Sequence, residues 1–203
     1  MADDKRVPIK PLEPDQWAQD LQNICADMNG LPINVHKLMA HSPGLLQAWW
    51  DFRNYAVSGG TLGQRLGELV ILRVGVHLAA WYEWASHVDR AMRIGMDLET
   101  VFEVLKPQPD VTKLEALVLR AVDELVVEHR ITERTRLELD SHFTTAQQMD
   151  LIAIQGMYVI LGGFINTWTL ELDSAVAGRI ETLTNRKDFE AAAARFQLAL
   201  TSG

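Results

Sequence analysis

Apolar residues recur along most of the chain at spacings of three and four positions, and no run of four to eight residues alternates cleanly between apolar and polar. This periodicity is typical of helices that bury one face. The pattern therefore predicts an all-α fold in which the helices pack as a bundle. The expected helices span about residues 17–28, 45–55, 62–77, 81–94, 112–129, 145–169 and 191–200.

Residues that favour helix ends flank several of these segments. Ser42 followed by Pro43 is a good helix start, with serine as the N-cap and proline in the first turn. The helix that follows is expected to carry Trp49 and Phe52 inward. Gly95 suits a left-handed C-cap for the helix that ends just before it.

The segment 62–77 widens its apolar face until nearly every position close to its end is hydrophobic. Such a helix is usually buried on most sides. Because several predicted helices are apolar on more than one face, a single copy is expected to leave an apolar surface that an oligomer would cover.

Composition narrows the class of protein. With 203 residues, 48% of them hydrophobic, the chain is long enough for one well-packed core and too short for two full domains. A net charge of −8 without dense Lys/Arg clusters argues against a nucleic-acid partner. The charged, proline-containing N-terminus differs from a signal peptide. Arg73 and His77 interrupt the apolar run 69–81, so no membrane span is expected and the predicted location is the cytoplasm.

The number of cysteines excludes several kinds of functional site. Cys25 is the only cysteine, so an intramolecular disulfide framework, a CxxC redox pair and a multi-cysteine zinc site are excluded. Cys25 itself is expected to be a small core residue.

Six polar residues stand in apolar surroundings, most of them where a core helix would carry Leu or Ala: Glu68, Arg73, His77, Tyr82, Glu83 and His87. Glu83 and His87 are four positions apart, so on one helix their side chains share a face and can share a hydrogen bond. A carboxylate beside an imidazole holds one tautomer and raises the basicity of the ring, which suits proton transfer near neutral pH. Trp81 and Trp84 flank the pair, and indole walls would raise the pKa of a carboxylate.

The same residues also have structural interpretations. A Glu/His pair four positions apart on a helix is commonly a solvated ion pair. Arg73 and Glu68 could likewise form a buried structural pair.

The remaining histidines give weaker signals. His36 and His41 lie in a connection where a helix end or a loop is expected to expose them. A metal site can be drawn from His77, Glu83 and His87, but their separations match no common ligand pattern such as HExxH. No metal is therefore expected.

Two stretches, RLGELVILRV at 65–74 and WYEWASH at 81–87, closely resemble the signature of the carboxymuconolactone decarboxylase and alkylhydroperoxidase D-like (AhpD-like) superfamily. The later segment 148–166, which contains Tyr158, is similar to the closing helix of that family. The resemblance covers about residues 31–172. It implies an AhpD-like, all-helical bundle built around a helical hairpin.

The peroxidase branch of this superfamily carries a glutamate, eleven residues, a CxxC, three residues and a histidine. On this sequence the glutamate is Glu68 and the histidine is His87, while the two cysteine positions hold Ala80 and Glu83. Without either thiol, disulfide-linked peroxide reduction is not carried over. The decarboxylase branch lacks the CxxC and keeps a glutamate four residues before the histidine, as Glu83 precedes His87 here.

The resemblance implies that Glu68, Glu83 and His87 line the site, with Tyr82 also facing it. Family decarboxylases act without a metal or an organic cofactor on a carboxylated unsaturated lactone, whose conjugated carbonyl accepts the electrons released with carbon dioxide. On this scheme His87 is the proton donor and Glu83 is its orienting partner. Glu68 is then a second acid-base group.

Further residues are expected to bind the substrate. Arg73 would hold a substrate carboxylate bidentately, and Tyr82, Trp81 and Trp84 would contact the rest of it. With Trp50 as a third indole near the site, the ligand is expected to be larger or more aromatic than a small polar lactone. Together with the family resemblance, this predicts an unsaturated lactone or another aromatic-degradation intermediate as the substrate.

Three segments follow from the extent of the resemblance. Residues 1–30 are an N-terminal extension with one helix, residues 31–172 are the family domain, and residues 173–203 are a C-terminal helical extension. The superfamily implies a homo-oligomer: a dimer, trimer or hexamer. Two alternatives to a lyase are a non-catalytic ligand-binding oligomer of the same fold and, with less support, a thiol-dependent peroxidase using Cys25.

Overall fold

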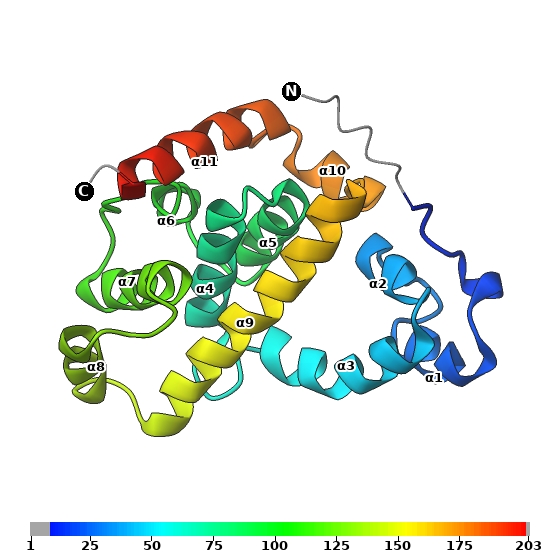
Figure 1. Cartoon of the computed structure of the whole chain (residues 1–203). Coiled ribbons are helices and arrows are strands. Elements are labelled where there is room, and N and C mark those ends of the chain that lie inside the picture. Colours follow the sequence, from blue (N-terminus) through cyan, green and yellow to red (C-terminus); the bar gives the residue numbers. More distant parts are fainter. Residues whose placement is uncertain (1–8, 202–203) are drawn as a thin grey trace.

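A computed structural model describes residues 9–201, which form eleven α-helices and two 3₁₀ turns with no strand among them (Figure 1). The predicted all-α class is therefore confirmed. The helices are α1 (Gln22–Asp27), α2 (Asn34–Met39), α3 (Pro43–Val57), α4 (Gln64–His77), α5 (Trp81–Arg93), α6 (Leu98–Glu103), α7 (Lys113–Val127), α8 (Glu133–Asp140), α9 (Thr145–Trp168), α10 (Ser174–Ile180) and α11 (Arg186–Thr201).

Helix α4 lies at the centre of the bundle, in contact with α5, α7, α9 and α11 (Figure 1). Every residue from Gly67 to His77 is buried. The widened apolar face predicted for this segment is thus explained, because α4 is surrounded by other helices and is buried on most sides. Any polar side chain on α4 must consequently find its partners inside the protein.

Helices α4 and α5 form a tight hairpin. Ala79, in the turn between them, has the left-handed backbone φ of +48°. Gly75 faces Trp84, and a Cβ atom added at Gly75 would lie only 3.4 Å from the Cβ atom of Trp84. The absence of a side chain at Gly75 therefore allows the two helices to approach closely, which brings polar residues of both into one site.

Most long helices lie where the periodicity predicts them. Helix α3 starts at Pro43 with Ser42 as its N-cap residue, although the serine side chain makes no capping hydrogen bond. Phe52 departs from the prediction, because its side chain is 38% exposed while Trp49 is buried. Phe52 lies toward the outer side of α3, where its ring meets Trp49 edge-on with centroids 5.9 Å apart.

The N-terminal stripe was predicted as one helix over residues 17–28, which is wrong. The chain instead forms 3₁₀ turns at Pro14–Gln16 and Gln19–Leu21 before the short helix α1. Trp17 and Leu21 are nevertheless buried. The short 3₁₀ turns therefore bury the same apolar residues that a single helix would have buried.

The C-terminal helices dock on the α4–α5 hairpin of the same chain. Helix α10 packs on α5, and α11 crosses α4 and α5 on the outside (Figure 1). Phe189 and Phe196 of α11 are fully buried. Phe189 stacks against Trp84 with ring centroids 4.9 Å apart. The hairpin is therefore covered on the side of Trp84 by the chain itself.

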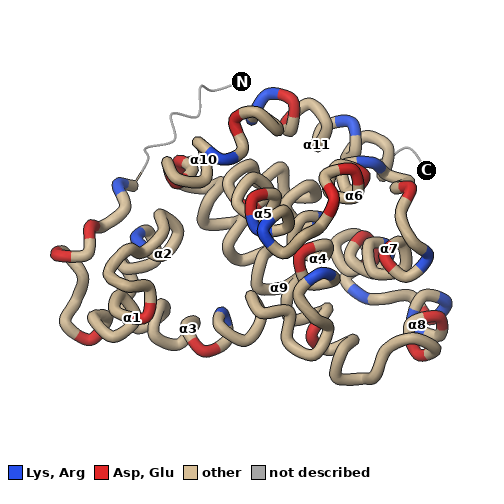
Figure 2. The backbone as a smooth tube through the Cα atoms, turned by 180° about the vertical axis from the view of Figure 1, so that it is seen from behind, with Lys and Arg blue, Asp and Glu red and all other residues tan. Residues whose placement is uncertain are grey.

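Helix α9 is long and apolar enough to cross a membrane by length and composition alone. Half of its most apolar window is buried inside the bundle, which is also the behaviour of the core helix of a soluble protein. Acidic and basic positions are interspersed over the outer helices, including α8 and α11 (Figure 2). The cytoplasmic location stays a prediction from the sequence.

Candidate active site

Glu68 of α4 and His87 of α5 form the centre of the site. The imidazole Nδ1 of His87 lies 2.6 Å from Oε2 of Glu68. Both side chains are buried, with at most 8% of either exposed. Because a carboxylate can only accept a hydrogen bond, this contact places the proton on Nδ1 and turns Nε2 toward other partners.

Arg90 compensates the charge of the buried Glu68 carboxylate. Its Nε lies 2.6 Å from the second oxygen, Oε1, of Glu68. Arg90 also donates a hydrogen bond from Nη2 to the carbonyl of Val57 at 2.5 Å. Glu68 is thus fixed from both sides, by His87 through one oxygen and by Arg90 through the other. Such fixed partners orient the imidazole.

Glu83 lies on the other side of the His87 ring. Its Oε2 is 3.6 Å from His87 Nε2, which is an ion-pair distance but longer than a hydrogen bond. Its Oε1 is buried without a hydrogen-bond partner. Burial raises the pKa of Glu83 to about 7, helped by the negative charges of Glu68 and Asp173 and opposed by His87. Glu83 therefore exchanges its proton near neutral pH.

The hydrogen-bonded partner of His87 differs from the predicted one. The family resemblance implied Glu83 as the orienting partner of His87 and Glu68 as a second acid-base group. The hydrogen bond to His87 comes instead from Glu68, on the neighbouring helix. The i, i+4 geometry of Glu83 brings it near the ring without the alignment of a hydrogen bond.

Glu83 and His87 face a cavity of about 210 Å³ between α2, α3, α5, α9 and α10. Apolar side chains from Ile33, Val35, Val57, Leu161 and Val176 line part of it. The polar residues in its wall are His36, Arg53, Tyr82, Glu83, Ser86, His87, Asp89, Arg90, Arg93, Tyr158 and Asp173. Glu68 stands behind His87 and is absent from this lining. The volume suits a small ring-containing molecule.

Two tyrosines border the cavity. Tyr158 of α9 meets the His87 ring edge-on, with centroids 5.0 Å apart. Tyr82 of α5 donates its hydroxyl to Oδ2 of Asp173 at 2.5 Å. Burial raises the pKa of both hydroxyls well above 10, so both stay protonated at neutral pH. Tyr158 is in this way a hydrogen-bond donor beside the imidazole.

His36 was expected at an exposed helix end, which is wrong. It is 3% exposed, and it lines the cavity from α2. Burial, with the nearby charge of Arg53, lowers the pKa of His36 to about 3, so the ring is neutral. Its Nδ1 lies 3.1 Å from Met28 Sδ. Helix α2 is too short for its periodicity to reveal this burial from the sequence.

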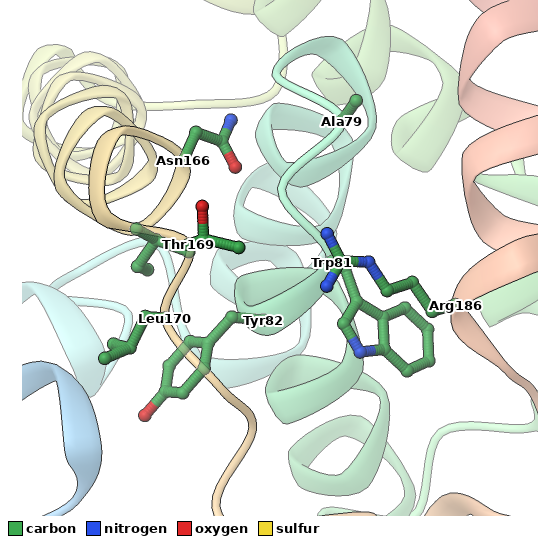
Figure 3. A pocket seen from close by; sticks show the side chains of 8 residues that line it. Ala79, Trp81, Tyr82, Asn166, Thr169, Leu170 and Arg186 are labelled. Atoms are coloured by element: carbon green, nitrogen blue, oxygen red, sulfur yellow. The ribbon is translucent and has the colours of Figure 1, made fainter. Parts of the chain in front are cut away.

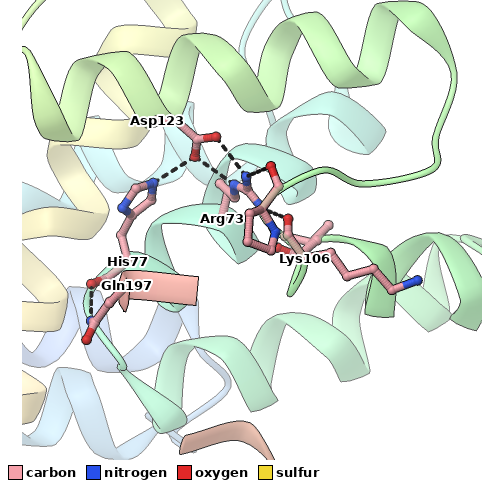
Figure 4. A network of polar contacts seen from close by, with 7 residues as sticks. Arg73, His77, Lys106, Asp123 and Gln197 are labelled. Atoms are coloured by element: carbon pink, nitrogen blue, oxygen red, sulfur yellow. Dashed lines mark hydrogen bonds and ion pairs between the residues drawn. The ribbon is translucent and has the colours of Figure 1, made fainter. Parts of the chain in front are cut away.

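Arg73 does not reach the cavity, contrary to its predicted role in holding a substrate carboxylate. Its side chain is fully buried and forms two hydrogen bonds of 2.7 Å with Asp123 of α7 (Figure 4). It also donates to the carbonyl oxygens of Val104 and Lys106, each at 2.7 Å. With these donors occupied inside the protein, Arg73 ties α4 to α7 and to the segment after α6.

His77 belongs to the same buried cluster. Its Nε2 lies 2.7 Å from Oδ1 of Asp123 (Figure 4). His77 is therefore engaged on the α7 side of α4 rather than with Glu83 and His87. Among residues 9–201, no group of three His, Cys, Asp or Glu side chains is arranged to hold a metal ion.

Trp81 and Trp84, predicted to contact the substrate, do not line the cavity either. Trp84 is fully buried between α5 and α11 against Phe189. Trp81 lines a separate hollow of about 40 Å³, room for roughly one water molecule, beside Arg186 (Figure 3). Tyr82 borders both spaces. Helix α5 thus directs its tryptophans away from the side that carries Glu83 and His87.

The signature positions of the thiol enzymes hold no sulfur. Ala80, at the first of the two cysteine positions, is fully buried at the start of α5. Cys25 is buried in α1 and does not line the cavity. The site described here therefore offers carboxyl, imidazole, guanidinium and hydroxyl groups, and no thiol.

The carboxymuconolactone decarboxylase family model matches residues 43–122, from the start of α3 into α7. The matched segment contains the α4–α5 hairpin with Glu68, Glu83 and His87. A comparison with curated proteins found no match.

Several solved structures share the fold. An uncharacterized peroxidase-related protein from Ralstonia eutropha JMP134, described as an alkylhydroperoxidase AhpD core, aligns with a TM-score of 0.72 at 18% identity, over 84% of this chain and 94% of that one. An uncharacterized peroxidase-related protein from Silicibacter sp. TM1040 gives 0.72 at 16% identity, over 88% and 97%.

A third structure is a cysteine-to-alanine variant of the debrominase Bmp8 in complex with 2,3,4-tribromopyrrole. It aligns with a TM-score of 0.72 at 14% identity, over 87% of this chain and 97% of that one. At these identities the structures show a common fold. Residues 43–122 are similar to the carboxymuconolactone decarboxylase family, and the similar structures show that the chain has an AhpD-like fold.

Proposed function

We propose that the protein is a cofactor-independent lyase of the carboxymuconolactone decarboxylase type, acting on an unsaturated lactone or another aromatic-degradation intermediate. One observation carries the proposal: the Glu83 carboxyl, whose pKa is about 7, faces the cavity beside His87 with one oxygen unpartnered. A buried carboxyl that titrates near neutral pH suits the return of a proton to carbon.

The reaction we propose begins with cleavage of the bond between the substrate's ring carbon and its carboxylate. The electron pair of that bond moves into the conjugated carbonyl, carbon dioxide leaves, and a dienolate forms. One proton held by the Glu83–His87 pair is then delivered to carbon, which restores the carbonyl. The pair regains its proton from solvent, so atoms and charges balance.

Other groups in the cavity wall support the same chemistry. The protonated hydroxyl of Tyr158 can donate a hydrogen bond to the dienolate oxygen, where negative charge develops. Ser86 Oγ, like Oε1 of Glu83, is buried in the wall without a hydrogen-bond partner in the described residues. Because buried polar groups are almost always partnered, these two atoms favour a ligand that supplies the missing contacts.

The cavity of this chain does not support thiol chemistry. Any thiol-dependent reaction needs a reactive cysteine, and the described residues that line the cavity include none. The bound 2,3,4-tribromopyrrole of the debrominase complex is a small planar ring. It supports a ring-sized ligand for the shared fold.

A turnover assay tests the proposal. Carboxylated lactones and aromatic-degradation acids are incubated with the wild type, and carbon dioxide release and loss of absorbance are followed. His87→Ala and Glu83→Gln are each expected to lose at least about a hundredfold in rate, the lower range for acid-base assistance. Glu99→Gln makes the same chemical change at an exposed position of α6 and is expected to keep full activity.

The opposite result is equally informative. If no substrate turns over, while ligands bind tightly to the wild type and equally to both variants, the lyase proposal fails. The protein would then be a non-catalytic ligand-binding member of the same fold.

A further inference from the structure

Three arginines line the cavity, and two of them are matched by carboxylates of the protein. Arg90 is paired with Glu68, with 2.6 Å between Nε and Oε1. Arg93 is paired with Asp89, with 3.1 Å between Nη2 and Oδ2. Arg53 of α3 forms no ion pair within the described part of the chain. Its one side-chain hydrogen bond, of 2.9 Å, is to the amide oxygen of Asn54.

The guanidinium of Arg53 is held against the cavity wall. It lies over the ring of Trp50, with 5.1 Å between Cζ and the ring centroid. Trp50 is itself fixed, because its indole Nε1 donates to Asp27 at 2.8 Å. A guanidinium held over a fixed ring, with Nη1 bonded to Asn54, leaves Nε and Nη2 without a hydrogen-bond partner in the described part of the chain and available for a bidentate contact.

The surroundings of Arg53 do not neutralise its charge. His36, across the same wall, is neutral because its pKa is about 3. Burial lowers the pKa of Arg53; Tyr158 opposes this effect and the like charge of Arg90 adds to it. A half-buried cation beside a second cation is electrostatically unfavourable until an anion arrives.

The cavity therefore has two functionally different walls. The wall formed by α5 carries the proton-transfer groups Glu83 and His87. The wall formed by α2 and α3 carries the unpaired cation Arg53 and the neutral ring of His36. A ligand with one anionic group and one reactive ring would meet both walls at once.

We propose that Arg53 is the specificity-determining residue of this site, where it binds a carboxylate of the ligand in a bidentate contact backed by Trp50. The role in turnover rests on the proposed function, whereas the binding contact does not. Anion recognition is thus assigned to Arg53 of α3, which lines the cavity, and not to Arg73, which is engaged by Asp123.

Calorimetric titration with two pairs of probes tests this contact directly. The carboxylates 2-furoate and benzoate are compared with the uncharged amides 2-furamide and benzamide, which have nearly the same shape. The wild type is expected to prefer each carboxylate, and the preference is expected to shrink as salt is added. In Arg53→Gln the carboxylates are expected to bind at least about tenfold more weakly, with amide binding unchanged.

Two further variants separate charge from geometry and from general effects. Arg53→Lys keeps the charge but cannot form the bidentate contact, so its carboxylate affinity is expected between those of the wild type and Arg53→Gln. Arg134→Gln removes an arginine from α8 whose side chain is 86% exposed, and it is expected to bind all four probes like the wild type. Circular dichroism spectra establish that each variant is folded.

The outcomes for this inference and for the proposed function differ. Equal affinities of the wild type for carboxylate and amide, including no measurable binding of either, overturn the inference, as does an undiminished preference in Arg53→Gln. The lyase proposal is judged separately, on the turnover of Glu83→Gln and His87→Ala. A carboxylate preference lost with Arg53 but no turnover would keep the inference and reject the lyase.

Discussion

Glu68 and His87 are nineteen positions apart in the sequence, on the two helices of one hairpin, and their side chains meet at 2.6 Å. This contact sets the tautomer of His87 and leaves its Nε2 facing Glu83. The imidazole is thereby held between a carboxylate paired with Arg90 and a carboxyl that titrates near pH 7. The two partners of the ring therefore differ: Glu68 is charge-compensated by Arg90, whereas Glu83 can exchange a proton with the imidazole near neutral pH.

Glu68→Gln is predicted to weaken the contacts of residue 68 with His87 and Arg90 while keeping a side chain of nearly the same size. The amide removes the charge that holds the Nδ1 proton of His87, and it leaves Arg90 without its carboxylate. Turnover is expected to fall by at least about tenfold, and nitrogen NMR of the His87 ring is expected to show a mixture of tautomers. An unchanged tautomer together with full activity would mean that Glu68 does not orient the ring.

The raised pKa of Glu83 predicts a specific pH dependence of stability. The folded-state pKa of about 7 exceeds the ordinary value of 4.5, so the folded protein binds an additional proton between these values. The stability contributed by the neutral carboxyl is therefore fully present below the unfolded pKa and is lost as pH rises through about 7. The expected loss is on the order of 3 kcal/mol.

Urea unfolding of the wild type and Glu83→Gln measures this effect, because glutamine does not titrate. From about pH 5 to about pH 8.5 the wild type is expected to lose stability relative to Glu83→Gln. Glu99→Gln is the control, with an exposed glutamate whose replacement should produce no such divergence. Parallel curves for the wild type and Glu83→Gln would show that Glu83 is ionised throughout this range.

The central part of the fold could be predicted because its signal is strong. The segments of α4, α5 and α9 are long and periodic, and Gly95 ends α5 as expected with its φ of +82°. Short helices such as α2 and α10 lack enough turns for a periodic signal, so they were missed. These short helices form one side of the cavity, which explains why much of its wall was unforeseen.

For the candidate site, the sequence indicated which residues are unusual but not where they point. Glu83 and His87 share a helix face, so their proximity follows from spacing alone. Arg73 is also polar in an apolar helix, yet it faces α7, and no pattern within α4 distinguishes that side from the α5 side. Arg53 was overlooked and His36 was wrongly expected to be exposed, because their places in the cavity wall arise from packing between helices distant in sequence.

The Arg73–Asp123 pair predicts a large structural effect away from the cavity. Arg73 is fully buried. Burial acts to raise the pKa of Asp123, but hydrogen bonds from Arg73 and His77 outweigh it, so the pKa lies below its ordinary value. Asp123→Asn leaves a buried guanidinium without a counter-ion, which is expected to cost about 3 kcal/mol of unfolding free energy. Denaturant unfolding at neutral pH measures this cost.

An exposed ion pair provides the comparison. Arg186 and Glu190 lie 2.7 Å apart on α11, with about half of each side chain exposed. Glu190→Gln is therefore expected to cost less than about 1 kcal/mol. Similar costs for Asp123→Asn and Glu190→Gln would show that Arg73 finds other compensation inside the protein.

The outer face of α9 predicts self-association. Met149, Ile152, Val159 and Ile160 are all at least 38% exposed on this one helix. A Cβ atom added at Gly156 would meet nothing within 4 Å, so the stripe between these residues is open. A surface of this kind along an apolar helix favours burial against a second copy of the chain. We therefore predict a homo-oligomer whose contact includes α9.

Ile160→Asp places a charge at the C-terminal end of this stripe and is expected to dissociate the oligomer, because a buried unpaired carboxylate is costly. Size-exclusion chromatography with light scattering compares its mass with that of the wild type. Leu137→Asp, on α8, changes an equally apolar side chain that is 55% exposed and should leave the mass unchanged. A monomeric wild type, or an Ile160→Asp oligomer of undiminished mass, would mean that another surface or no surface joins the copies.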